Sequence, residues 1–319
     1  MLSLRLGDAV PAGNRFVAAI GNFDGVHAGH RYLIRQVTEA AAAQDLASLA
    51  ITFWPHPRAV LQPERWPGYL TTFAERTELL AGCSLDATFA LPFDRAMAQR
   101  SPEAFVSLLA VSVPLAELWV GEDFRFGHNR AGDVATLRRL CLEQHIDVQS
   151  IPRLHQRDHG EDVSSGRIRA LVREGAVDVA RRALDRPYRL GGTVVSGDRR
   201  GRQLGFPTAN LAPDEGKLVP GRGVYAATAT VDGLDRPAAV SIGVRPQFDG
   251  VTELAEAYIL DFAGDLYGAR LELDFVARLR NEERFDSVDA LVRQMDSDVA
   301  AVRAMIHPGL VPETIAEAP

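Results

Sequence analysis

The sequence predicts two domains of different fold class, an α/β domain with a parallel sheet and then an all-β domain that ends in a helix. From residue 15 to about residue 151, apolar strand-like runs alternate with helical patterns, which indicates a parallel sheet covered by helices on both faces. From about residue 184, closely spaced strand-like runs are separated by Gly, Pro and Asp-Gly turns, which is typical of an antiparallel barrel or sandwich. We therefore expect domains at 1–183 and 184–319, and a chain of 319 residues is long enough for both.

The composition narrows the class of protein. No apolar run approaches the length of a membrane span, and the first residues lack the apolar core of a secretory signal, so we expect a cytoplasmic protein with no membrane partner. The net charge is −7 and no basic block interleaves with aromatic residues, so a nucleic-acid partner is not expected. No obligate protein partner is inferred from the sequence. Lys217 is the only lysine, which excludes a Walker-type loop and leaves Arg, His, backbone amides and a metal to bind any nucleotide phosphates.

Polar loops follow several of the expected strands of the first domain. The strands are expected at residues 15–20, 47–53, 87–91, 116–120 and 146–151, with helices at 102–110, at 132–143 and after residue 30. Ligands bind beyond the carboxyl ends of the strands in such sheets. The segments at those ends are rich in His, Arg, Asn and Gly, namely 22–30, 54–58 and 121–130. We expect these three loops to converge on one edge of the sheet.

The first of these loops, GNFDGVHAGH at residues 21–30, has the pattern of a phosphate-binding turn between a strand and a helix. Glycines at 21, 25 and 29 let the backbone approach a ligand, and the free amides of the helix start favour an anion. His27 and His30 could be ordinary polar residues at a helix start, half of a zinc site, or donors to phosphate oxygens. Neither Cys83 nor Cys141 completes a zinc-ligand spacing, so the metal interpretation is the weakest.

A second candidate anion site lies at residues 164–169, SSGRIR. Ser164 or Ser165 can simply cap a helix whose apolar face carries Ile168 and Leu171. The same geometry would let the two hydroxyls, the first-turn amides and Arg169 hold the outgoing phosphates of a nucleotide.

The second domain contains two polar features that its strand pattern does not explain. Its strands are expected at 188–196, 223–231, 236–243, 254–262 and 269–279, followed by a helix at about 287–306 capped by Asp286 or Ser287. Thr208 and Asn210 share one face of an extended segment, and their oxygens suit Mg²⁺, although a cross-strand pair without a ligand has the same pattern. Glu256 interrupts an apolar strand and lies either on a solvent face or in a buried functional position.

The chain resembles the bifunctional bacterial riboflavin kinase/FAD synthetase (FMN adenylyltransferase) family over nearly its whole length. The matching motifs, in order, are GNFDGVHAGH, TFWPHPR, VGEDFRFGHNRAGD, SSGRIR, LDRPYRLGGTVVSGDRRGRQLGFPTANL, GVYA, SIGVRP, DLYG and LRNEERFDS. The resemblance implies a Rossmann-like nucleotidyltransferase domain that adenylylates FMN to FAD with release of pyrophosphate. It also implies a Greek-key barrel that phosphorylates riboflavin to FMN, with ATP and Mg²⁺ used in both steps.

The resemblance also implies roles for particular residues. His27 and His30 would be the HxGH pair that meets the ATP phosphates, Arg169 would act with the second phosphate loop, and Glu256 would be the general base for the ribityl hydroxyl of riboflavin. Thr208 and Asn210 would bind Mg²⁺ and the ATP phosphates. The other expected nucleotide- or flavin-binding positions are Gly21, Asn22, Phe23, Asp24, Gly25, Asn129, Ser164, Ser165, Gly201 and Gly205.

Three positions depart from the family pattern. Gly166 stands where the family usually has a threonine, so one hydroxyl near the pyrophosphate is lost while the amide remains. Ser241 and Gln247 replace the usual asparagine and threonine around SIGVRPQ. Two alternatives to the bifunctional enzyme follow, a riboflavin kinase with an impaired adenylyltransferase domain and a flavin-binding module without catalysis.

Overall fold

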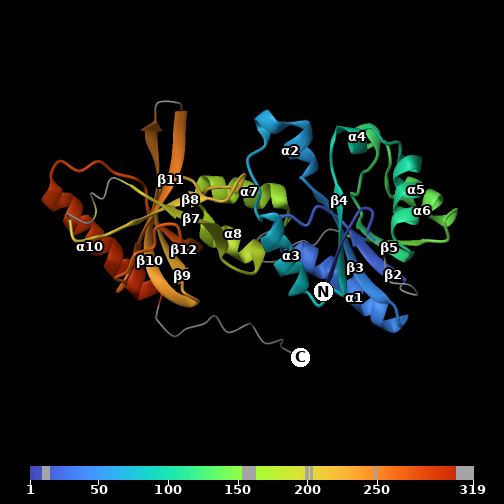
Figure 1. Ribbon diagram of the computed structural model, residues 1–319, viewed down its shortest axis with the longest axis horizontal. Helices are drawn as coiled ribbons and strands as arrows, with labels where there is room; N and C mark the ends of the chain where they lie inside the picture. The colour runs from blue at the N-terminus through green and yellow to red at the C-terminus, as the bar shows by residue number, and fades with distance from the viewer. Residues whose placement is uncertain (9–14, 153–162, 198–200, 202–203, 248–249, 307–319) are drawn as a thin grey trace. The chain divides into compact units, whose positions relative to one another are not determined.

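The structure is a computed structural model that describes residues 1–8, 15–152, 163–197, 201, 204–247 and 250–306, without the side chains of residues 244–254. The chain forms two compact units, Met1–Arg167 and Ile168–Pro319 (Figure 1). Helices α7 (Ser165–Glu174) and α8 (Val177–Leu184) come between the two sheets in the sequence, and α8 contacts strand β12 (Arg270–Arg280) of the second unit. The predicted boundary at residue 184 lies just before the first barrel strand, whereas the second compact unit begins earlier, at Ile168.

The first unit contains the predicted parallel sheet. Its six strands in spatial order are β1 (Leu2–Arg5), β4 (Ala87–Pro92), β3 (Ala47–Trp54), β2 (Phe16–Ile20), β5 (Leu115–Gly121) and β6 (Asp147–Ile151). Every neighbouring pair is parallel. Strand β1 is additional to the predicted strands, because only Leu4 of its four residues is buried and its apolar pattern is correspondingly weak.

Helices cover both faces of this sheet, as the alternation of elements predicts. Helices α1 (Ala28–Ala43) and α3 (Phe73–Ala81) pack on one face against Val17 and Ala19 of β2. Helices α5 (Pro102–Ser112) and α6 (Val134–Leu142) pack on the other face, against Phe16, Ala18 and Ile20. Because alternate residues of β2 enter different cores, all five residues of this strand are apolar and buried.

The α-helices of the first unit begin at residues whose side chains accept hydrogen bonds from backbone amides of the first turn. Ser101 accepts from Ala104 N at 3.2 Å, and Asp133 accepts from Thr136 N at 2.8 Å. Thr72 and Glu75 form a capping box that starts α3. Besides α3, the sequence prediction missed several short helices, α2 (Pro57–Leu61), η1 (Pro63–Arg65), α4 (Arg95–Ala98) and η2 (His128–Arg130).

The second unit contains a closed six-stranded antiparallel barrel, which decides between the predicted barrel and sandwich. The strands in spatial order are β10 (Leu234–Gln247), β11 (Gly250–Ile259), β8 (Ala209–Pro213), β7 (Tyr188–Val195), β12 and β9 (Gly223–Val231). Strand β8 completes the barrel and was predicted only as an extended segment.

Helix α10 (Val288–Met305) packs on the outside of the barrel. The hydroxyl of Ser287 accepts from Ala290 N at 3.2 Å, so Ser287 is the cap. Val299, Val302 and Ile306 pack with Ala226 and Leu260, so the apolar stripe in the second half of this helix faces the protein core. In the part of the chain that the structure describes, no helix is long and apolar enough to cross a membrane.

Candidate functional site

The polar loops after β2, β3 and β5 lie at one edge of the sheet because these three strands are parallel neighbours. The chain leaves β2 for β3 on one side and later returns to β5 on the other side, so the strand order reverses at β2. Ligands of parallel sheets bind at such a reversal, beyond the carboxyl ends of the strands. The predicted convergence of residues 22–30, 54–58 and 121–130 on one edge is confirmed.

The loop from β2 to α1 contains several residues in the left-handed region of backbone space. The φ angles are 48° at Phe23, 88° at Gly25 and 39° at Val26, and this conformation is costly for a β-branched residue such as valine. Phe23, Asp24 and Gly25 are buried, while Gly21 and the neighbouring Asn22 are partly exposed. The predicted contacts of the three buried residues with a ligand therefore stay predictions, and their visible role is to shape the loop.

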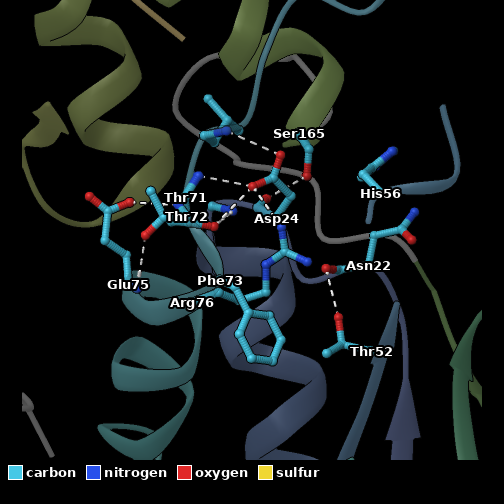
Figure 2. Close-up of polar contacts among 12 residues, drawn as sticks. Asn22, Asp24, Thr52, His56, Thr71, Thr72, Phe73, Glu75, Arg76 and Ser165 are labelled. Atoms are coloured by element: carbon cyan, nitrogen blue, oxygen red, sulfur yellow. Dashed lines mark hydrogen bonds and ion pairs between the residues drawn. The ribbon is translucent and has the colours of Figure 1, made fainter. Parts of the chain in front are cut away.

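The side chain of Asp24 is the centre of a buried hydrogen-bond network (Figure 2). Its Oδ1 accepts from Thr71 N at 2.9 Å, Thr71 Oγ1 at 2.9 Å and Arg76 Nη2 at 3.2 Å, and its Oδ2 accepts from Leu70 N at 3.1 Å. Asp24 and Arg76 have no exposed surface. Because a buried carboxylate is strongly destabilising unless it is paired and hydrogen-bonded, this network fixes the position of the loop.

The two histidines of the loop lie against each other at the start of α1. Their rings are stacked, with centroids 3.6 Å apart and planes 19° from parallel. His27 is the N-cap of α1, and its side chain accepts from His30 N at 3.4 Å. Since Nδ1 of His27 acts as the acceptor, the nitrogen left to donate a proton to a ligand is Nε2. His27 is thus a helix-start residue, as one of the interpretations holds. This role does not conflict with the predicted donation to phosphate, because Nε2 takes no part in the cap.

Ser164 and Ser165 have separate roles at the start of α7. Ser164 Oγ accepts from Arg167 N at 3.2 Å and so caps the helix. Ser165 Oγ instead donates to the main-chain oxygen of Asp24 at 2.8 Å, which joins the two predicted phosphate-binding segments (Figure 2). Arg169 lies on the same helix and is 4% exposed.

The other two loops at this edge are also locally constrained. His56 caps α2, where its Nδ1 accepts from Arg58 N at 3.1 Å, and its ring stacks on Trp66 with centroids 4.5 Å apart. Asn129 is exposed and has a left-handed backbone, with φ 52° and ψ 25°. Its Nδ2 lies 3.0 Å from Nε2 of His128. Asparagine tolerates this conformation better than most residues, so it suits a tight loop here.

The cysteines do not join the histidines in a metal centre. Cys141 is buried, and burial raises the pKa of its thiol to about 11, which keeps it protonated at neutral pH. Among the described residues, no group of three His, Cys, Asp or Glu side chains gathers in a way that could hold a metal ion.

In the barrel, Glu256 of β11 lies directly opposite Asn210 of β8. The neighbours of Glu256 in the strand, Ala255 and Ala257, are fully buried, so by alternation Glu256 points to the outer face of the barrel, where it is half-buried. Asn210 is 6% exposed. Ser241 of β10 is the partner of Glu256 on its other side, whereas the side chain of Gln247 lies outside the described structure.

Gly201 and Thr208 lie close together just before β8. Leu204 N and Phe206 N both donate to the oxygen of Gly201, at 3.1 and 2.9 Å. Gly205 has a φ of 85°, which favours glycine. A side chain at Gly201 would meet the oxygen of Phe206 at 2.3 Å and Oγ1 of Thr208 at 3.4 Å. The predicted role of these glycines in ligand binding stays a prediction. Gly201 is needed because a side chain would collide with Phe206, and Gly205 because of its backbone angle.

Sequence reasoning missed Thr71, Arg76 and Gly197 as residues of these sites. Thr71 and Arg76 lie in a segment without strand periodicity, although the capping-box pattern at Thr72 and Glu75 indicates a helix there. An added Cβ at Gly197 would be 2.2 Å from Nδ2 of Asn210, a packing constraint that no local pattern reveals.

Two family models match the chain, one for each unit. The FAD synthetase model matches residues 11–167, and the riboflavin kinase model matches residues 184–306. The fold and the two sites therefore define a two-domain enzyme of flavin nucleotide synthesis. The chain belongs to the family of bifunctional riboflavin kinases/FMN adenylyltransferases.

Relatives of the same description cover almost the whole chain. The bifunctional riboflavin kinase/FMN adenylyltransferase of Pseudomonas fluorescens is 38% identical over 92% of this chain and 93% of its own length. The Escherichia coli K12 protein is 35% identical over 90% and 91%. A solved structure from Streptococcus pneumoniae, described as a macrolide-efflux protein, matches with a TM-score of 0.86 and 28% identity over 95% of this chain and 99% of that one.

Proposed function

We propose that the chain phosphorylates riboflavin to FMN in the barrel and adenylylates FMN to FAD, with release of pyrophosphate, in the parallel-sheet unit. The observation that carries this proposal is the joint match of both family models, each over the unit whose fold and polar site fit its chemistry. ATP is the co-substrate of both steps. The proposed substrates and products are therefore all small molecules.

In the parallel-sheet unit, the proposed role of the HxGH loop is to bind ATP at the α and β phosphates. The start of α1 supplies free amides and the positive end of a helix dipole, which favour phosphate. His27 Nε2 and the His30 ring lie beside these amides and would donate to oxygens whose charge grows in the transition state. From the family resemblance, Ser165 and Arg169 are the proposed partners of the outgoing pyrophosphate, and Asn129 is the proposed contact to flavin or nucleotide.

In the barrel, the proposed general base is Glu256. A base must lie within hydrogen-bond reach of the hydroxyl it deprotonates. Its half-buried position directly opposite Asn210, away from the apolar side chains that fill the inside of the barrel, supports this role. The proton of the ribityl hydroxyl would pass to the carboxylate of Glu256 as the oxygen attacks the γ-phosphate of ATP, and the bond from the γ-phosphorus to the bridging oxygen would break to release ADP.

Mg²⁺ is the proposed metal of the kinase step, with Thr208 and Asn210 as its protein ligands. A hydroxyl and an amide oxygen are hard donors that suit Mg²⁺, which usually takes few protein ligands and completes its shell with water and phosphate oxygens. When bound, Mg²⁺ would neutralise the charge of the transferring phosphates. The orientation of Asn210 by its strand partner and by Gly197 is the contribution of the protein.

The proposed function is tested by separate product analysis with purified protein and Mg²⁺. Riboflavin and ATP are expected to give FMN and ADP, and FMN and ATP are expected to give FAD and pyrophosphate. If riboflavin gives FMN but neither riboflavin nor FMN gives FAD, only the riboflavin kinase activity is present. Binding of riboflavin without any turnover would make the chain a flavin-binding module. We also propose a cytoplasmic location and action without a protein partner.

Replacing Gly197 by alanine is expected to lower kcat for riboflavin phosphorylation by about 10²-fold, because a displacement of about 1 Å in a positioned group has this effect. The added Cβ would lie 2.2 Å from Asn210 Nδ2 and would push the amide away. FMN adenylylation by the same variant serves as the internal reference and should change less than about 2-fold. Gly82→Ala is the matched control, since an added Cβ there makes only ordinary contacts. Normal kinase activity of Gly197→Ala would contradict the role of Asn210.

Replacing Gly166 by threonine is expected to raise the kcat/KM of FMN adenylylation by about 2- to 10-fold, the worth of one net hydrogen bond. The site can accept the side chain, because the nearest atom to an added Cβ is Ser164 Oγ at 3.9 Å. Gly166→Ala is the control, since it removes the flexibility of glycine without adding a hydroxyl. Equal activities of the threonine and alanine variants would show that the missing hydroxyl has no part in catalysis.

A further inference from the structure

We propose that Asp24, Thr71 and Arg76 are positioning residues for adenylyl transfer. They hold the residues of the HxGH loop that have positive φ angles in place through buried hydrogen bonds. This inference rests on the proposed adenylyltransferase activity and assigns roles within that site. Asp24 is expected from the sequence to contact a ligand. The inference assigns it instead the role of holding the loop in place. The geometry that supports it lies entirely within the parallel-sheet unit.

The first step of the argument is the burial of the ion pair. Arg76 is among the largest fully buried side chains of the described residues, and its Nη2 lies 3.2 Å from Asp24 Oδ1. Its guanidinium also donates to Phe53 O at 3.4 Å and lies over the ring of Trp54, with Cζ 5.3 Å from the centroid. Arg76 thereby joins the end of β3 to the loop after β2. Because burying two charges is costly and loss of one partner leaves the other uncompensated, the pair ties Asp24 and Arg76 to each other.

The second step is the hydroxyl of Thr71, which bonds in both directions. It donates to Asp24 Oδ1 at 2.9 Å and accepts from Gly25 N at 3.1 Å. Gly25 lies between Phe23 and Val26, and all three have positive φ. The two bonds of Thr71 therefore hold the centre of the strained segment, which would otherwise relax toward ordinary backbone angles.

The third step links the anchor to the groups that would touch ATP. The segment ends at Val26, and His27 follows directly as the cap of α1. The main-chain oxygen of Asp24 accepts the hydroxyl of Ser165, at the start of the second phosphate-binding segment. Figure 2 shows Thr71, Arg76 and Ser165 around Asp24, so that one residue fixes both segments. A change in the anchor would displace both sets of phosphate contacts while leaving every contacting side chain present.

The test uses kinetics of the full chain with Thr71→Val as the mildest variant, because valine keeps the size of threonine and loses only the hydroxyl. We expect kcat for FMN adenylylation to fall about 10-fold, with KM for FMN and ATP within about 2-fold, because positioning acts mainly in the transition state. Arg76→Met should lower kcat further. Arg139→Met, which alters an exposed ion pair of the same unit, is the matched control and should change neither value. Riboflavin phosphorylation is measured in each variant.

A double variant distinguishes positioning from a general loss of stability. In the His30→Ala background, Thr71→Val should lower the remaining kcat by clearly less than the about 10-fold expected in the wild type, because the part of its effect that acts through His30 is already lost. Multiplication of the two losses, or a wild-type kcat in Thr71→Val, would overturn the inference. So would a loss that matches the unfolded fraction measured by thermal melting. Absence of FAD from the wild-type chain would refute the proposed function, and this inference with it.

Discussion

Glu256→Gln is expected to lower kcat for riboflavin phosphorylation by about 10²- to 10⁴-fold, the usual contribution of a general base. Glutamine keeps the shape of the side chain and its place opposite Asn210, but it cannot accept the proton of the ribityl hydroxyl. Because the change removes an interaction of the transition state, KM for riboflavin should change little. The measurement is FMN formation from riboflavin, ATP and Mg²⁺ under saturating conditions.

The adenylyltransferase activity of the same variant is the control for this prediction. Glu256→Gln should form FAD from FMN at the wild-type rate, because the substituted residue belongs to the barrel alone. Glu253→Gln, three positions along the same strand, tests whether any carboxylate lost from β11 has the same effect. Kinase activity of Glu256→Gln close to that of the wild type would remove Glu256 from the role of general base.

His30→Ala is expected to have the opposite selectivity, with loss of FAD formation and normal riboflavin phosphorylation. Removal of a donor to developing charge lowers kcat by about 10²- to 10³-fold. The loss of the ring also removes the stacking partner of His27, so both imidazoles of the pair are affected. Pyrophosphate release with FMN and ATP as substrates measures the effect directly.

A second histidine substitution shows whether this effect is specific. His145 lies in the turn between α6 and β6 and is exposed, so His145→Ala should leave both activities unchanged. Equal losses of FAD formation and FMN formation in His30→Ala would contradict independent sites, since His30 lies in the parallel-sheet unit.

The sequence predicted those parts of the fold that have a local physical signal. Strand β2 was recognisable because both its faces are buried, and α10 because its apolar stripe and Ser287 cap are local. The sequence did not predict β1 or β8. Strand β1 buries only Leu4, and β8 is a short strand that exists because β7 and β11 pair with its two edges. Pairing between distant strands leaves little trace in so few residues.

The same distinction holds for the sites. Glycines and histidines in one decapeptide marked the loop after β2, and the family resemblance supplied roles for Thr208, Asn210 and Glu256. The anchor of the loop could not be predicted, because Asp24 meets Thr71 and Arg76 only after α3 packs on the face of the sheet that also carries α1. The position of Glu256 opposite Asn210 could likewise not be predicted, because it depends on the register of β8 and β11.

The most direct test of two independent activities is complementation between two inactive variants. Neither Glu256→Gln nor His30→Ala alone should convert riboflavin to FAD at an appreciable rate, because each lacks one of the two steps. An equimolar mixture of both, with riboflavin, ATP and Mg²⁺, should form FAD after a lag, as FMN released by His30→Ala is adenylylated by Glu256→Gln. A mixture that forms no FAD, although each variant retains its single activity, would contradict two separate sites joined by free FMN.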